Sequence, residues 1–192
     1  MTDCFGKEKA MDNAFIMAID LGTSFIKAGL YDLRGNCYAM EQSPIKSDSS
    51  RSGIFLQNGE DIYASVLSCM KGIAEASKAQ CGKIAAIGFT GQMAGVMGVD
   101  GNWNDVTSWS CSLDTRYTPY AEKQIAALQK EFLEIGGTNG PLMAPKCEWF
   151  IHEFPEKARR VVKYMPISSY ITGKLGALPI EEAKVGVSYL TW

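Results

Sequence analysis

The sequence predicts an α/β domain with a mixed β-sheet, and three stretches carry that prediction. Two apolar runs at residues 15–19 and 25–31 flank a turn that is too short for a crossover helix, so we expect them to pair antiparallel. Apolar residues recur at steps of three and four in residues 62–74, which is typical of an amphipathic helix. The apolar run at residues 83–90 has no polar face, which favours a central strand with helices on both faces of the sheet.

The first two strands are expected to continue into a third. A turn at residues 32–36 leads to a further run at residues 37–42, so the sheet should open as a three-strand antiparallel meander. The helix that follows has Asn58 as a candidate N-cap, with Asp61 three residues later.

The second half of the sequence predicts a hairpin and more helices. Asp100-Gly101 is a hairpin turn signal. Helical spacing over residues 117–132 ends at Gly136-Gly137, where glycine can take the left-handed conformation that ends a helix. Shorter helical segments are expected at residues 147–154 and 168–172.

Length and composition point to a soluble protein that acts on a small molecule. The chain has 192 residues with 46% hydrophobic residues and a formal net charge of -2, so it offers no broad cationic surface for nucleic acid or lipid. Its six cysteines form no CxxC pair, which indicates a reducing, cytoplasmic setting. We expect residues 1–13 to be a flexible tail and residues 14–192 to form one domain. That domain is expected to be incomplete, because residues 184–192 have the sequence of a strand and no closing helix or tail follows them.

The first turn is a candidate phosphate site. Gly22, Thr23 and Ser24 can present successive backbone N–H groups and two hydroxyls, a concave donor array suited to phosphate oxygens. Asp20 ends the preceding strand and could hold Mg²⁺ through water, and Lys27 could reach the same oxygens. The alternative is that Asp20 only accepts turn N–H groups and that Lys27 is a solvated strand residue.

Four segments carry a further signal when they are read together. They are AIDLGTSFIKAGLYDLRGN at 18–36, IGFTGQMAGVMGVDGNW at 87–103, SWSCSLDTR at 108–116 and APKCEWFIHEFPE at 144–156. In order and spacing they resemble the N-terminal domain of the FGGY family of carbohydrate kinases, the relatives of xylulokinase, glycerol kinase and gluconokinase. The resemblance extends from about Ile16 to the end of the chain.

The resemblance implies an RNase H-like domain of the actin-like ATPase type that binds the sugar, while a second domain binds most of the ATP. The reaction would move the γ-phosphoryl of ATP, with Mg²⁺, to a sugar or polyol hydroxyl. Asp20 would organise the metal and phosphates, and Gly22, Thr23, Ser24 and Lys27 would contact phosphate.

The resemblance also implies a set of sugar-binding residues, namely Gln92, Met93, Trp109, Asp114 and Arg116. Gln92 supplies both a donor and an acceptor, as polyol recognition requires. Trp109 could instead be a core residue. Asp114 could be the N-cap of the next helix with Arg116 solvated, or the two could form a bidentate pair.

Two positions depart from the family pattern. The family's usual His after Gln-Met is Ala94 here, and a later polar sugar contact is replaced by Gly186, so D-xylulose is not a safe substrate assignment. The family's catalytic Asp and its adenosine pocket would lie beyond residue 192, so we expect the isolated chain to be inactive.

Two other functions remain open from the sequence. One is a non-catalytic sugar-binding or interaction module that kept the actin-like fold. The other is a different actin-like phosphotransferase or nucleotide hydrolase. Such a protein would keep the first turn but would not need Gln92 and Trp109 to line a pocket. Homo-oligomerisation is possible under each of them.

Overall fold

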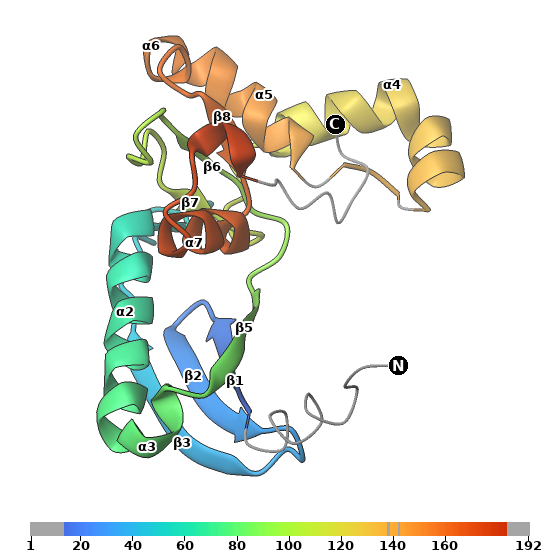
Figure 1. Cartoon of the computed structure of the whole chain (residues 1–192). Coiled ribbons are helices and arrows are strands. Elements are labelled where there is room, and N and C mark those ends of the chain that lie inside the picture. Colours follow the sequence, from blue (N-terminus) through green and yellow to red (C-terminus); the bar gives the residue numbers. More distant parts are fainter. Residues whose placement is uncertain (1–13, 138, 142, 184–192) are drawn as a thin grey trace, which may run out of the picture. The chain divides into compact units, whose positions relative to one another are not determined.

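The computed structural model describes residues 14–137, 139–141 and 143–183 (Figure 1). By their internal contacts these residues form two compact units. Unit 1 contains residues up to Ile45 and Asp61–Gly91, and unit 2 contains Lys46–Glu60 and the residues from Gln92 onward. The expected tail and the expected last strand, with Gly186, lie outside the described residues.

Unit 1 is built on a four-stranded mixed sheet with the order β3-β2-β1-β5. Strands β1 and β2 pair antiparallel, β2 and β3 pair antiparallel, and β1 and β5 pair parallel. The bounds are β1 Phe15–Leu21, β2 Phe25–Asp32, β3 Cys37–Pro44 and β5 Ile84–Gly91.

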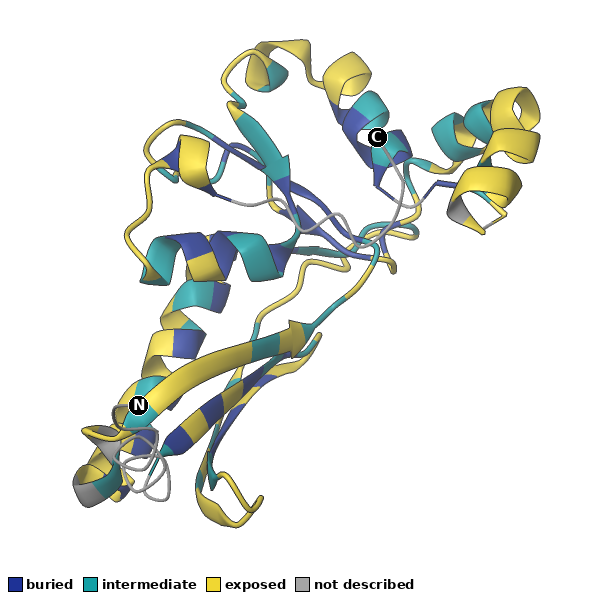
Figure 2. Ribbon diagram, turned by 45° about the vertical axis from the view of Figure 1, so that its right-hand side comes forward, coloured by how far each residue is buried: buried dark blue, intermediate teal, exposed yellow. Residues whose placement is uncertain are grey.

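The core of unit 1 follows from alternation along the strands. Every second residue of β1 is buried, from Phe15 to Leu21, and Ile26 and Leu30 of β2 are fully buried (Figure 2). Helix α2, Gly59–Ala76, contributes a buried stripe of Ile62, Val66, Cys69 and Ile73, and the Cys69 thiol lies 3.7 Å from the carbonyl oxygen of Ile26. The helix therefore buries its apolar face against one face of the sheet.

Strand β5 differs from the central strand that its apolar sequence predicted. Among the described residues it pairs with β1 and forms an edge of the sheet, and residues 85–88 are exposed. Ile16 on the neighbouring strand is also exposed. In the described part of unit 1, apolar composition alone did not show whether a neighbouring element covers the strand. A short helix, α3 Lys78–Cys81, precedes β5.

The described residues of unit 2 include two small antiparallel ribbons. In one, β4 Leu56–Gln57 pairs with β7 Trp109–Ser110. In the other, β6 Met97–Val99 pairs with β8 Lys163–Met165. The Asp100-Gly101 turn forms as expected, because the Asp100 carboxylate accepts the N–H groups of Asn102 and Asn104. The ladder partner of β6, however, comes from a segment more than sixty residues away, which local turn chemistry could not indicate.

The helices of unit 2 lie near the positions that periodicity predicted. Helix α4, Thr118–Gly136, ends at Gly137, whose φ of 63° is left-handed. The other helices are α5 Ala144–Glu153, α6 Pro155–Ala158, α7 Ile167–Leu175 and the 3₁₀ turn η1 Ile180–Glu182. No helix in the described part of the chain is long and apolar enough to cross a membrane.

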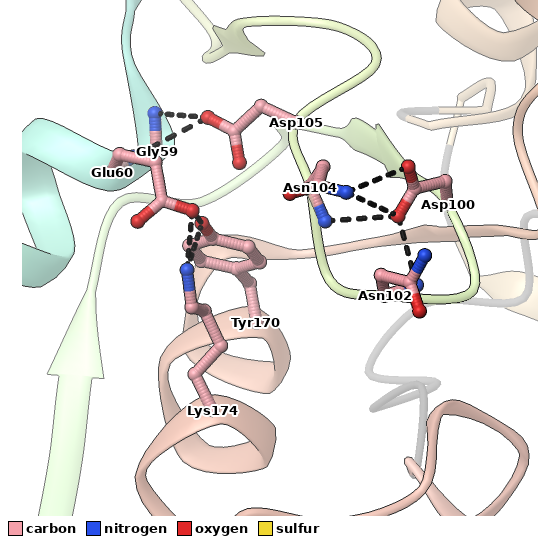
Figure 3. A network of polar contacts seen from close by, with 8 residues as sticks. All are labelled: Gly59, Glu60, Asp100, Asn102, Asn104, Asp105, Tyr170 and Lys174. Atoms are coloured by element: carbon pink, nitrogen blue, oxygen red, sulfur yellow. Dashed lines mark hydrogen bonds and ion pairs between the residues drawn. The ribbon is translucent and has the colours of Figure 1, made fainter.

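A distant carboxylate caps the start of α2 (Figure 3). One carboxylate oxygen of Asp105 accepts the backbone N–H groups of Gly59 at 2.7 Å and of Glu60 at 3.3 Å. A Cβ at Gly59 would lie 2.7 Å from that oxygen, so any larger residue would require the Asp105 side chain to shift. The Glu60 side chain accepts from the Tyr170 hydroxyl at 2.9 Å and pairs with Lys174. The helix start is thus fixed by residues that the local capping pattern did not include.

Candidate functional site

The candidate phosphate turn joins β1 to β2 in unit 1. Antiparallel pairing places Asp20 opposite Lys27. Thr23 and Ser24 are exposed at the tip, and a Cβ at Gly22 would lie 2.6 Å from the carbonyl oxygen of Phe25. Glycine at position 22 is therefore required by the close approach of the two strands.

The carboxylate of Asp20 is half-buried at the end of β1. Within the part of the chain that the structure describes, no hydrogen bond or ion pair uses this carboxylate. A half-buried carboxylate without a protein partner retains its oxygens for a ligand outside the chain, such as a hydrated divalent cation. The donor set and the tight glycine turn therefore fit a Mg²⁺-bound phosphate.

In unit 2 the side chains of Trp109, Gln92 and Gln57 form a continuous polar chain. The Trp109 indole N–H donates to Oε1 of Gln92 at 3.0 Å, and Nε2 of Gln92 donates to Oε1 of Gln57 at 2.7 Å. Nε2 of Gln57 in turn donates to the Ser47 hydroxyl at 3.1 Å. These bonds fix which end of each amide is oxygen and which is nitrogen.

Trp109 is fully buried, and its N–H is used within the chain. A Cβ at Gly95 would lie 2.3 Å from the indole ring, so the ring packs directly on the backbone there. Trp109 is therefore a core residue, the alternative considered from the sequence, and its N–H also orients the amide of Gln92.

Met93 and Ala94 follow Gln92 in the sequence, and the backbone of Ala94 has an unusual conformation. Met93 is 67% exposed. Ala94 has a φ of 55°, in the left-handed region that residues other than Gly seldom occupy. The position where the family pattern has a His therefore carries only a methyl group on a strained backbone.

Asp114 and Arg116 form the bidentate pair considered from the sequence. Nε of Arg116 lies 3.0 Å from one carboxylate oxygen of Asp114, and Nη2 lies 2.7 Å from the other. Asp114 is 1% exposed, and the Arg116 guanidinium also lies over the Trp149 ring at 4.5 Å. The carboxylate and the ring together fix the plane of the guanidinium.

Sequence reasoning missed Lys146 as a candidate site residue. Its side chain is almost fully buried in α5, and its ammonium donates to the Ser110 hydroxyl and to two backbone carbonyls. The signal was present in the Ala-x-Lys-x-x-Trp pattern, where a Lys falls on the apolar face of a helix. Burial lowers the pKa of Lys146 to about 8.

A cavity of about 220 Å³ lies within unit 2 on one side of the β4–β7 ribbon. The cavity is lined by one facing pair of the ribbon, Leu56 and Ser110. The other facing pair, Gln57 and Trp109, does not line the cavity. This arrangement follows from the alternation of side chains along strands. Other residues that line the cavity are Asp105, Arg116, Lys146, Trp149 and Phe154.

The structure thus brings two pairs of the expected sugar-binding residues into contact, Gln92 with Trp109 and Asp114 with Arg116. Residues 15–190 match the family model described as the FGGY family of carbohydrate kinases, N-terminal domain. The chain belongs to the FGGY family of carbohydrate kinases.

Curated relatives of this FGGY chain include several kinases. It is 27% identical to the xylulose kinase of Lactococcus lactis over 168 residues, which cover 82% of this chain and 32% of that protein. It is 23% identical to the autoinducer-2 kinase of Klebsiella pneumoniae over 188 residues, 91% of this chain and 34% of that protein. The FGGY chain therefore spans about a third of the length of these relatives.

Solved structures show the same fold. The xyloylose kinase of Brucella ovis superposes with a TM-score of 0.76 at 22% identity, covering 83% of this chain and 34% of that one. The glycerol kinase of Plasmodium falciparum gives a TM-score of 0.74 at 19% identity, covering 86% of this chain and 35% of that one. The FGGY chain therefore has the α/β, actin-like fold of sugar kinases.

Proposed function

We propose that the complete protein transfers the γ-phosphoryl group of ATP to a hydroxyl of a sugar or polyol, and that this chain is its N-terminal sugar-binding part. The observation that carries the proposal is the polar chain from Trp109 through Gln92 to Gln57. A partly buried amide oriented at both ends provides a fixed recognition element for hydroxyl groups, and the chain belongs to a family of carbohydrate kinases.

The turn between β1 and β2 is the proposed phosphate contact. Gly22, Thr23 and Ser24 would hold phosphate oxygens, and Lys27, opposite Asp20 in the pairing, would add a positive charge. Asp20 would hold Mg²⁺ through water. The metal would neutralise charge that develops on the phosphoryl oxygens, while the residues of the turn orient the phosphate.

In the proposed sugar site each residue has a distinct task. Gln92 presents its oriented amide, and Met93, which is exposed, supplies an apolar contact. Asp114 holds the Arg116 guanidinium in one plane by two hydrogen bonds, so Arg116 can contribute directional N–H donors. Trp109 contributes indirectly, by orienting Gln92.

We propose that the remaining steps depend on residues outside this chain. A base that takes the proton from the sugar hydroxyl, and most of the ATP pocket, would come from a C-terminal kinase domain. Since the chain spans about a third of its relatives' length, we propose that the chain by itself does not turn over. The proposed compartment is the cytoplasm, where ATP is available.

The test is a phosphorylation assay of the complete gene product with Mg-ATP against D-xylulose, D-ribulose, D-gluconate and glycerol. Phosphate transfer to at least one of them is expected, and none from residues 1–192 alone. Failure of the complete product on the whole panel, with binding of a sugar retained in calorimetry, would favour a non-catalytic sugar-binding module.

A further inference from the structure

Lys146 is a buried cation whose three protons are matched by three oxygens of one short segment. Its Nζ lies 3.1 Å from the Ser110 hydroxyl, 2.7 Å from the carbonyl oxygen of Cys111 and 3.0 Å from that of Asp114. The side chain is 1% exposed, and the ammonium also lies 4.0 Å from the centre of the Tyr117 ring. Every donor of the ammonium is therefore used.

The stability of the fold gives little reason to bury a charged side chain at position 146. Burying an ammonium costs a large desolvation free energy, and an apolar side chain of similar volume at such a place is often neutral or stabilising. The hydrogen bonds of Lys146 are, however, directional, and they connect helix α5 to a segment that has no regular structure between β7 and α4. A buried charge can specify one conformation where apolar packing would permit several.

The segment held by Lys146 lies between one residue of each proposed sugar-binding pair. Immediately before it, Trp109 donates to Gln92, and at its end Asp114 holds Arg116. A shift of the carbonyl groups at 111 or 114 would move the indole at one end and the carboxylate at the other. Both recognition elements thus depend on the position of a single short turn.

We propose that Lys146 is a positioning residue for sugar binding, which fixes the turn at residues 110–114 so that Gln92 and Arg116 keep their orientation. The proposal rests on the proposed function of this site. Lys146 contacts no substrate in this role and does not act as a base. Its removal therefore affects ground-state binding of the sugar more than the chemical step.

The charge state of Lys146 provides a second readout. Burial is the main cause that brings its pKa to about 8, opposed by Asp114 and Cys111 and reinforced by Arg116. The titratable and charged groups that face it are thus Cys111, Asp114 and Arg116 from the turn and Tyr117 from the start of α4. Above this pH the side chain loses one of its three donors, so the turn is held less firmly and the KM for sugar should rise.

The experiment compares Lys146→Met with Lys163→Met in the complete gene product, using the best substrate of the four-sugar panel. Lys163 is a matched control, because its ammonium also donates to three oxygens, the carbonyls of Ile180, Glu181 and Ala183, within the same unit. Lys146→Met should raise the sugar KM about tenfold, with kcat changed by less than about twofold. Lys163→Met should leave the sugar KM unchanged.

The pH profile of the wild type keeps the proposal testable even if Lys146→Met does not fold. The sugar KM of the wild type and of Lys163→Met should rise above pH 8, and that rise should be absent from Lys146→Met. An unchanged KM in Lys146→Met, an equal rise in Lys163→Met, or a flat wild-type profile between pH 7 and about 9.5 would overturn the proposal. Absence of any phosphorylation by the wild type would instead overturn the proposed function, and this inference with it.

Discussion

The indole N–H of Trp109 donates to the amide oxygen of Gln92 at 3.0 Å, and this bond decides what Gln92 can offer to a ligand. Because the amide oxygen accepts from Trp109 and the amide nitrogen donates to Gln57, the amide cannot flip without losing both bonds. The residue that the sequence singled out for sugar recognition is therefore held by two partners that are themselves buried.

Replacing Gln92 tests this recognition element directly. In the complete gene product, Gln92→Ala should raise the sugar KM about tenfold or more, because the sugar loses an oriented partner and the Trp109 N–H is left buried without an acceptor. The measurement is steady-state kinetics with varied sugar at saturating Mg-ATP. Gln42→Ala, at an exposed glutamine on β3, is the control and should have no effect. An unchanged KM in Gln92→Ala would remove this residue from the site.

Gly95→Ala should disturb the same site through packing. The added methyl group would lie 2.3 Å from the Trp109 ring, so the indole must move away from Gln92 or the backbone must shift. We expect the free energy of unfolding to fall by about 1–3 kcal/mol. Urea denaturation checks this, with Gly101→Ala as control, since a Cβ there meets nothing within 4 Å. Equal stability of the two variants would contradict the packing described for Trp109.

Asp20→Asn separates phosphate chemistry from sugar binding. The substitution keeps the shape of the side chain and removes the charge that would hold Mg²⁺. The kcat of the complete gene product should fall by about a hundredfold or more, because charge on the transferring phosphoryl group is no longer compensated. Calorimetric affinity for the sugar should stay the same. A variant that kept its kcat would show that Asp20 serves only the turn.

The stability of the fold should depend on pH through Lys146. The pKa of Lys146 is lowered to about 8 in the folded protein, whereas the unfolded chain keeps this proton up to its ordinary value of 10.5. Between these pH values the unfolded state binds more protons, so the free energy of unfolding should rise with pH. Lys146→Met should lack this rise when the two proteins are denatured in urea at pH 7.5 and 10. A rise of the same size in the free energy of unfolding of both proteins would show that a group other than Lys146 causes the pH dependence.

If fold stability and sugar binding respond to rising pH in opposite directions, the role of Lys146 is positioning and not only packing. As Lys146 loses its proton, the desolvation cost falls and the fold gains stability, while the turn at residues 110–114 loses one hydrogen bond. A residue with only a structural role would change sugar binding in the same direction as stability. The pH profiles of the free energy of unfolding and of the sugar KM, measured on one preparation, therefore test two separate effects of the Lys146 charge.

Parts of the fold could be predicted from local pattern because local forces decide them. The alternation in β1 and β2 and the apolar stripe of α2 report which face of each element is buried. The left-handed Gly137 at the end of α4 follows from the conformational freedom of glycine. The partner of β6 and the exposure of β5 depend on segments distant in the sequence, and local pattern did not reveal them.

By itself the sequence determined the strands of unit 1, the longer helices, the family and the residues Asp20, Gln92, Trp109, Asp114 and Arg116 as candidates, because residue chemistry and short spacing are local properties. Only the tertiary structure decided that Trp109 turns its N–H to Gln92, that Asp105 caps a helix 45 or more residues earlier, and that Lys146 bonds to the turn between the Gln92–Trp109 and Asp114–Arg116 pairs. The physical reason is that a buried polar group must find a partner in space, and its nearest partner in space is often far away in the sequence.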